Sequence, residues 1–78
     1  MQPENIEQLI RDGLDGAEVR VMSDDNTHFE AIVISADFEG KRPLARHQMV
    51  YGTLGDLMGG EIHALSIKAL TPAEAGQN

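Results

Sequence analysis

THFEAIVIS, at residues 27–35, is the stretch that decides the fold. Its side chains alternate as in a β-strand, so that Phe29, Ala31 and Val33 lie on one side of it. The second half of the stretch is apolar on both sides, which is typical of a strand inside a sheet rather than at its margin. We therefore expect residues 27–35 to form the central strand.

A helix and a further strand are expected after this central strand. Residues 36–42 form a connection, and Pro43 suits the first position of a helix that should run to about Met58. Its expected apolar stripe has 3-4-3-4 spacing and consists of Leu44, His47, Tyr51, Leu54 and Met58, with Val50 and Leu57 beside it.

Glycines mark the expected boundaries between elements in the second half of the chain. Gly52 and Gly55 weaken the helix and would let another backbone approach closely. Gly59 and Gly60 end it, residues 62–70 form the third strand, and residues 71–74 begin a short terminal helix.

Three elements are expected before the central strand. Residues 3–14 have apolar side chains at helical spacing, with Pro3 at the first helical position and glycines at the exit. Residues 17–22 alternate like a strand, and residues 23–26, Ser-Asp-Asp-Asn, are typical of a turn. A short turn between two strands predicts an antiparallel hairpin.

The resulting order is α-β-β-α-β with a short last helix, a small α/β domain that occupies residues 1–78. The connection from the second strand through a helix to the third makes that pair parallel, so the three-stranded sheet is mixed. Helices should cover one face of the sheet, because neither element can bury its apolar side alone.

Composition limits the function classes. The chain has no cysteine and therefore no thiolate of its own for a metal. Its start lacks the basic and apolar segments of a signal peptide, and no apolar run could span a bilayer, so we expect a cytoplasmic protein without a membrane contact. The net charge of -7 opposes binding to bulk nucleic acid.

Half of the six basic residues gather in one place, namely Lys41, Arg42 and Arg46. Arg42 and Arg46 are four residues apart and share a helix face, so the three can form a compact basic patch. The patch suits an acidic surface of a partner protein or a contact with DNA, and the alternative interpretation is an ordinary solvated helix start.

The three histidines have different expected roles. His63 lies at the start of the third strand, next to the Gly59-Gly60 turn, where an imidazole can face solvent and bind a metal. His28 lies one step inside the central strand and is either a ligand or an exposed strand residue. His47, on the apolar stripe, is expected to be a core histidine with a hydrogen bond.

A linked pattern in the second half resembles the BolA family. It consists of Phe38-Glu39-Gly40-Lys41, Leu44-Ala45-Arg46-His47, Val50-Tyr51 and Ile62-His63-Ala64-Leu65-Ser66. The resemblance extends from the first helix to Thr71-Pro72-Ala73-Glu74. It implies a KH-like fold and a non-enzymatic role as an iron–sulfur partner protein, or as a small DNA-binding transcriptional regulator.

The resemblance also implies a metal site. The histidine of the family that matches His63 is a ligand of a [2Fe–2S] cluster in a complex with a monothiol glutaredoxin, where the glutaredoxin and glutathione supply the thiolates. Many members place a second ligand, Cys or His, between the first two strands. Here that place holds residues 23–27, so His28 is the nearest imidazole, and Asp24 or Asp25 would be a harder, less suitable ligand.

Other functions receive less support from the sequence. An RNA-binding KH module carries a Gly-x-x-Gly loop, and the Gly13-Leu14-Asp15-Gly16 segment, which has this spacing, is acidic and lies outside the expected place. No motif indicates catalysis. We expect a monomer or weak homodimer that holds no cluster when isolated. An interaction module without a metal remains an alternative.

Overall fold

The structure, a computed structural model, describes residues 1–76. Its elements are α1 (Pro3–Gly13), β1 (Glu18–Met22), β2 (His28–Ile34), the 3₁₀ turn η1 (Ala36–Phe38), α2 (Pro43–Leu54), the 3₁₀ turn η2 (Gly55–Leu57) and β3 (Ala64–Leu70). This order confirms the predicted α-β-β-α-β arrangement.

The sheet is mixed, and β2 is its central strand. β1 pairs with β2 antiparallel, with Val19 opposite Val33, and β2 pairs with β3 parallel. The parallel register runs from His28 opposite Ala64 to Ile34 opposite Leu70. The central place of β2 agrees with the prediction from its apolar second half, and the parallel pair agrees with the prediction from the helical connection between β2 and β3.

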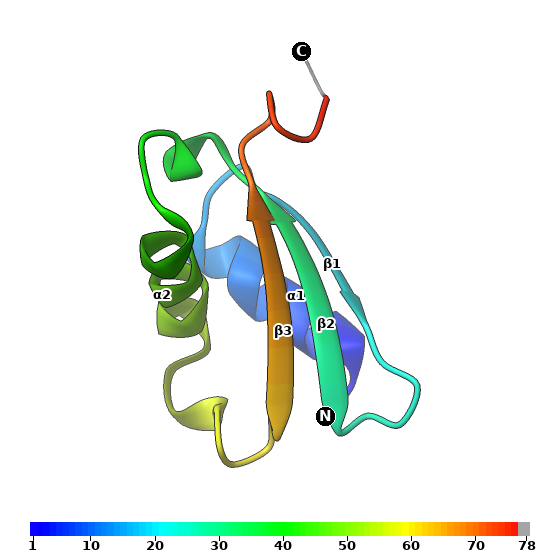
Figure 1. Ribbon diagram of the computed structural model, residues 1–78. Helices are drawn as coiled ribbons and strands as arrows, with labels where there is room; N and C mark the ends of the chain where they lie inside the picture. Colours follow the sequence, from blue (N-terminus) through cyan, green and yellow to red (C-terminus); the bar gives the residue numbers. More distant parts are fainter. Residues whose placement is uncertain (77–78) are drawn as a thin grey trace.

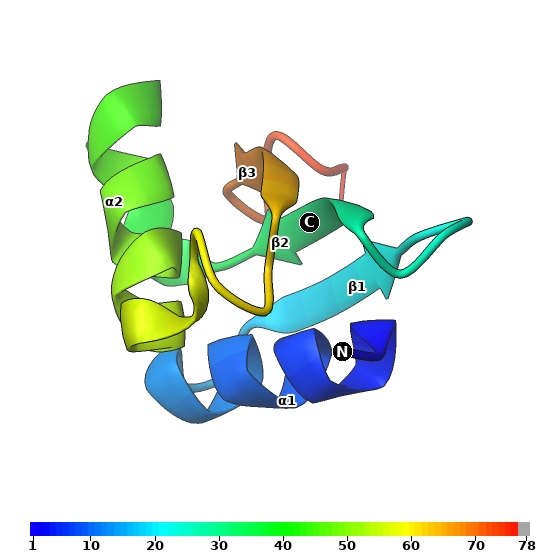
Figure 2. The same cartoon turned by 90° about the horizontal axis from the view of Figure 1, so that it is seen from below.

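The core lies between the sheet and the two helices. Phe29, Ala31 and Val33 of β2 are buried, and the helices bury the side chains Ile6, Ile10, Val50 and Leu54 against them. Figures 1 and 2 show both helices on the same side of the sheet, with α1 crossing behind the strands in Figure 1 and lying next to β1 in Figure 2. The opposite face carries alternate residues such as Arg20, Glu30 and Lys68, which are exposed. Burial of each large apolar side chain contributes about 1.5–3 kcal/mol, so the helix-covered face stabilises the fold.

Side chains of α1 close the outer edge of β1. The backbone N–H of Val21 donates to Glu7 Oε2 at 3.0 Å, and Arg11 Nη2 donates to the carbonyl of Val19 at 3.1 Å. Glu7 and Arg11 also form an ion pair at 3.0 Å. The pair occupies backbone groups that another strand would need, which protects this edge from strand addition.

Side chains of α2 reach the outer edge of β3 in the same way. Tyr51 Oη donates to the carbonyl of Leu65 at 3.4 Å, and Arg46 Nη1 donates to the carbonyl of Ala69 at 3.1 Å. Both outer strands are therefore tied to the helix that lies next to them.

Helix α2 is shorter than predicted. It ends at Leu54 rather than near Met58, because Gly55 takes φ +58° and ψ −128° and the chain continues as η2. The predicted stripe is wrong at Leu44, which is 70% exposed, and at Tyr51, which is 38% exposed. Only the C-terminal half of α2 reaches the core, through Val50 and Leu54.

The end of the chain differs in two details. β3 begins at Ala64 rather than at residue 62, since Ile62 forms an isolated bridge with Met58 instead. The predicted helix at 71–74 is a single turn, in which Ala75 N–H donates to the Thr71 carbonyl at 3.0 Å. Within residues 1–76, no helix has the length and apolar character that crossing a membrane requires.

The close approach between helices occurs at Gly13 and not at the predicted glycines. A Cβ added at Gly13 would lie 2.8 Å from Cβ of Thr53 and would also meet its Cγ2. A Cβ added at Gly52 would have no neighbour within 4 Å. Contact between α1 and α2 therefore depends on the missing side chain at Gly13.

Substituting these two glycines should change stability in opposite directions. Gly13→Ala should lower the free energy of unfolding by about 1–3 kcal/mol, because Thr53 and α2 must move to make room. Gly52→Ala should raise it by up to about 1 kcal/mol, because alanine favours the helix and meets open space. Urea unfolding of both variants measures this, and a stabilising Gly13→Ala would contradict the helix contact.

Candidate functional site

The structure brings His28 and His63 to the same end of the sheet. Because β2 and β3 are parallel, they start at one end, at the bottom of Figure 1. His28 is the first residue of β2 and lies opposite Ala64, the first residue of β3. His63 directly precedes Ala64, so the two predicted ligand residues belong to adjacent strand starts.

A tight turn anchored in the core holds His63 in place. Ile62 is fully buried, its N–H donates to the Leu57 carbonyl at 2.9 Å, and its own carbonyl accepts from Gly59 N–H at 2.9 Å. The following residue, Ala64, is already paired with β2. The exposed imidazole of His63 therefore extends into solvent from a fixed backbone.

The turn before β2 agrees with its prediction and is stabilised by its own side chains. Ser23 Oγ accepts from the N–H of Asn26 at 2.9 Å and donates to the carbonyl of His28 at 2.6 Å. Asn26 has φ +57°, a conformation that asparagine tolerates better than most residues. These bonds fix the backbone at His28.

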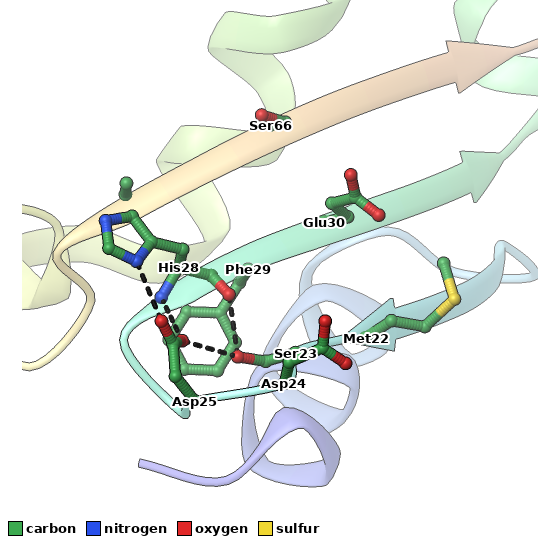
Figure 3. Close-up of a pocket in the computed structure, with 9 residues that line it drawn as sticks. Met22, Ser23, Asp24, Asp25, His28, Phe29, Glu30 and Ser66 are labelled. Atoms are coloured by element: carbon green, nitrogen blue, oxygen red, sulfur yellow. Dashed lines mark hydrogen bonds and ion pairs between the residues drawn. The ribbon is translucent and has the colours of Figure 1, made fainter.

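Asp25 forms the central contact of this turn. Its Oδ1 accepts from the N–H groups of Thr27 and His28, both at 2.9 Å, and its Oδ2 lies 3.0 Å from Nδ1 of His28 (Figure 3). The hydrogen bond from the His28 ring, together with those from the two backbone N–H groups, holds the pKa of Asp25 well below its ordinary value. Asp25 is therefore ionised throughout the neutral range.

A hollow of about 320 Å³ lies beside this pair on the helix-free face. It is lined by His28, the turn, and side chains of β2 and β3 that include Glu30, Ala64 and Ser66. No three or more His, Cys, Asp or Glu side chains within residues 1–76 are grouped to hold a metal ion. The nitrogen donors at this end are the imidazoles of His28 and His63, and imidazole can replace thiolate on one iron of a [2Fe–2S] cluster.

The predicted basic patch is divided by the structure. Lys41 and Arg42 are exposed, whereas only 12% of the Arg46 side chain is exposed. Arg46 donates to the Lys41 carbonyl at 2.8 Å and to the Ala69 carbonyl at 3.1 Å, and it pairs with Glu74 at 2.6 Å. Arg46 thus ties the start of α2 to the end of β3, which leaves Lys41 and Arg42 as the accessible cations of the patch.

The predicted basic patch lies at the opposite end of the sheet from His28 and His63. Arg46 contacts the end of β3, and His63 precedes its start. A strand rises about 3.3 Å per residue, so the seven residues of β3 separate the two places by about 20 Å. A small contact surface of a partner cannot cover both.

The prediction for His47 is wrong. The residue lies on α2, but it is half-buried rather than in the core, and no hydrogen bond to its ring occurs among residues 1–76. The sequence analysis also missed the internal bonds of Arg46 and the role of Asp25. The spacing of Asp25 three residues before His28, within a turn, was the one available signal for the latter.

Comparisons with known proteins agree on one family. A family model described as BolA-like protein matches residues 10–74. The chain is 48% identical to human "BolA-like protein 1" over 52 residues, which cover 67% of this chain and 38% of that protein. It is 39% identical to "Acid stress protein IbaG" of Escherichia coli K12 over 75 residues, which cover 95% of this chain and 88% of that protein.

A solved structure shows the same fold. The bolA protein homologue from Coxiella burnetii superposes with a TM-score of 0.83 at 44% identity, covering 97% of each chain. The aligned part spans less than two fifths of the mammalian relatives, whereas it spans nearly all of the bacterial ones.

Replacing Arg46 should reveal its structural role. Arg46→Ala should lower the free energy of unfolding by about 1.5–3 kcal/mol, because a part-buried, charge-assisted bond to the Ala69 carbonyl and an exposed one to the Lys41 carbonyl are lost. Arg42→Ala, an exposed arginine at the same helix start, is the matched control and should change it little. Equal effects of Arg46→Ala and Arg42→Ala on the free energy of unfolding in urea would contradict the structural role of Arg46.

The ion pair with Glu74 adds a pH dependence. The Arg46 guanidinium, with help from the Thr71 backbone, lowers the pKa of Glu74 from 4.5 to about 2. The pair therefore stabilises the fold fully above pH 4.5, and this contribution is lost as the pH falls through about 2. The stability difference between the native protein and Glu74→Gln should shrink over that window.

Proposed function

The chain belongs to the BolA-like protein family, and on that premise we propose that it is a non-enzymatic adaptor that binds a monothiol glutaredoxin and shares a [2Fe–2S] cluster with it. Its role is in iron–sulfur trafficking or in regulation of the response to iron and stress. A bacterial relative that spans nearly the same length carries the name of an acid stress protein.

The parallel pairing of β2 with β3 is the observation that carries this proposal. It sets His28 and His63 at neighbouring strand starts, at an end of the sheet that the helices leave accessible. Two neutral imidazoles are suitable ligands for an iron that also accepts thiolates. The chain has no cysteine, so the thiolates come from the glutaredoxin and from glutathione.

Each residue of this end has a distinct part in the proposed function. His63 is the principal ligand, and its backbone is fixed by the buried Ile62 and the paired Ala64. His28 is the second nitrogen donor. The bound cluster supplies electron transfer or iron and sulfide for delivery, whereas the chain supplies ligand atoms, orientation and a docking surface.

Binding to DNA is the second candidate function. Lys41 and Arg42 are adjacent and exposed, and neither side chain has an acidic partner among the described residues. Two cations on a protein of net charge -7 support at most a weak contact with phosphate. This contact lies at the other end of the sheet, so the two functions would use separate surfaces.

Loss of the His63 imidazole should alter the cluster without altering the fold. His63→Ala should change the visible absorption and circular dichroism of the complex formed with a cluster-loaded monothiol glutaredoxin, and should speed cluster loss. Its free energy of unfolding should stay within about 0.5 kcal/mol of the native value, because the side chain is exposed.

His47→Ala is the matched control for this experiment. It removes an imidazole from α2, away from the strand starts, and should leave the spectrum and the lifetime of the cluster unchanged. A complex in which His63→Ala and His47→Ala behave alike would remove the proposed function.

Any affinity for DNA should depend on Lys41 and Arg42. The double variant Lys41→Gln/Arg42→Gln should lose most of it and reduce the slope of log K against log salt by about 2. Arg20→Gln/Lys68→Gln, the same charge change on the helix-free face, is the control. Arg46 is left unchanged because its loss would disturb the fold. Tight, salt-resistant binding by the first variant would contradict the phosphate contact.

A further inference from the structure

We propose that Asp25 is a positioning residue that fixes the His28 ring with its proton on Nδ1 and thereby presents Nε2 as the atom that binds metal. The inference deepens the proposed function and rests on it for the identity of the metal. In this inference the turn before β2 orients a ligand side chain in addition to connecting β1 with β2.

The orientation of the carboxylate is set by the backbone. Oδ1 of Asp25 accepts two N–H groups, from Thr27 and His28, each at 2.9 Å. With one oxygen held by two donors, the plane of the carboxylate is fixed, and Oδ2 is directed at the ring of His28, 3.0 Å from Nδ1. The backbone N–H groups thus orient the Asp25 carboxylate, and the carboxylate in turn orients the His28 ring.

The proton in this contact must belong to the imidazole. A carboxylate is ionised at neutral pH and can then only accept hydrogen bonds, and Asp25 Oδ2 lies 3.0 Å from Nδ1 of His28. Nδ1 of His28 therefore carries hydrogen, and in the neutral ring the lone pair is on Nε2. Figure 3 shows this second nitrogen on the side of the ring that points away from Asp25.

The rest of the turn keeps the pair in register with β3. Ser23 Oγ bridges the Asn26 N–H and the His28 carbonyl, at 2.9 Å and 2.6 Å. His28 is also paired with Ala64, the neighbour of His63. Nε2 of His28 is consequently presented from a strand start adjacent to the one that His63 precedes.

A carboxylate behind a histidine is the usual second contact of a metal-binding imidazole. It fixes the tautomer and the ring orientation and makes the ligand nitrogen more basic, and its removal weakens metal binding about 10–100-fold. The ligand class that this arrangement suits is a metal ion that accepts imidazole, such as the iron of a cluster or Zn²⁺.

Two substitutions distinguish the positioning role of Asp25 from a general effect of its negative charge. Asp25→Asn keeps Oδ1 for the backbone N–H groups but replaces Oδ2 by an NH₂ group that donates to Nδ1, so the neutral ring should place its proton on Nε2. Asp24→Asn removes the same charge one residue earlier, from an exposed carboxylate without a hydrogen bond in the described part of the chain.

The ring state can be read in the isolated protein. Nitrogen-15 NMR of the imidazoles at about pH 8, above the ordinary imidazole pKa, should show His28 protonated at Nδ1 in the native protein and in Asp24→Asn. In Asp25→Asn the proton should be on Nε2. A native ring protonated mainly on Nε2, or a ring that responds equally to both substitutions, would overturn the proposal.

Titration of the isolated protein with Zn²⁺ tests the consequence for binding. Asp25→Asn should weaken the affinity about 10–100-fold and Asp24→Asn should not. In a His28→Ala background, Asp25→Asn should have no further effect, because Asp25 acts through the ring. A further loss there would make Asp25 a ligand itself, and equal losses in both Asn variants would indicate bulk charge. Absence of Zn²⁺ binding by the native protein would also refute the proposal.

The glutaredoxin complex distinguishes failure of this inference from failure of the proposed function. If the ring state and the Zn²⁺ affinities follow the expected order but no cluster-bridged complex forms, Asp25 keeps its role and the proposed partner is wrong. If the complex forms while the native ring is protonated on Nε2, the proposed function stands and the positioning role is wrong.

Discussion

The parallel pairing of β2 with β3 is the constraint on which the rest of the structure depends. It forces the chain to return through α2 to the end where β2 began, so both strands start together. The turn before β2 and the Ile62 turn before β3 therefore meet at one end, with their histidines. The same constraint sends η1, the start of α2 and the terminal turn to the other end (Figure 1). Separation of the two candidate surfaces is thus a property of the topology.

Polar side chains of the helices determine how the sheet can meet a partner. Glu7 and Arg11 occupy backbone groups of β1, and Tyr51 and Arg46 occupy carbonyls of β3. A small sheet with two free edges invites pairing with other strands, and charged groups at the edges oppose it. What remains accessible is the helix-free face and the two ends of the sheet. A partner that contacts the histidines must approach along one of these surfaces, which agrees with docking at the strand starts.

The fold could be predicted from the sequence because its signals are local and strong. The alternation in β2 and the apolar second half of that strand specify a central strand, and the helix between two strands specifies a parallel pair. The predictions fail for side chains whose burial or hydrogen bonding is determined by tertiary contacts. Five residues of the predicted stripe lie in α2, but packing against the rest of the core buries only Val50 and Leu54. Likewise, the four acceptors around Arg46 come from segments far apart in sequence, and no periodicity reports them.

At the candidate site, residue type alone could not predict which aspartate contacts His28. Asp24 and Asp25 are equivalent as turn formers, yet only Asp25 accepts from the backbone and from His28. Its selection depends on the positive φ of Asn26, which closes the turn and brings the start of β2 back over the carboxylate. Under the proposed function, a chain without thiolates contributes imidazole nitrogens, and an imidazole binds metal better when its ring is already oriented and its free nitrogen already defined. In that proposal the hydrogen bonds of the turn orient the His28 ring before any metal binds.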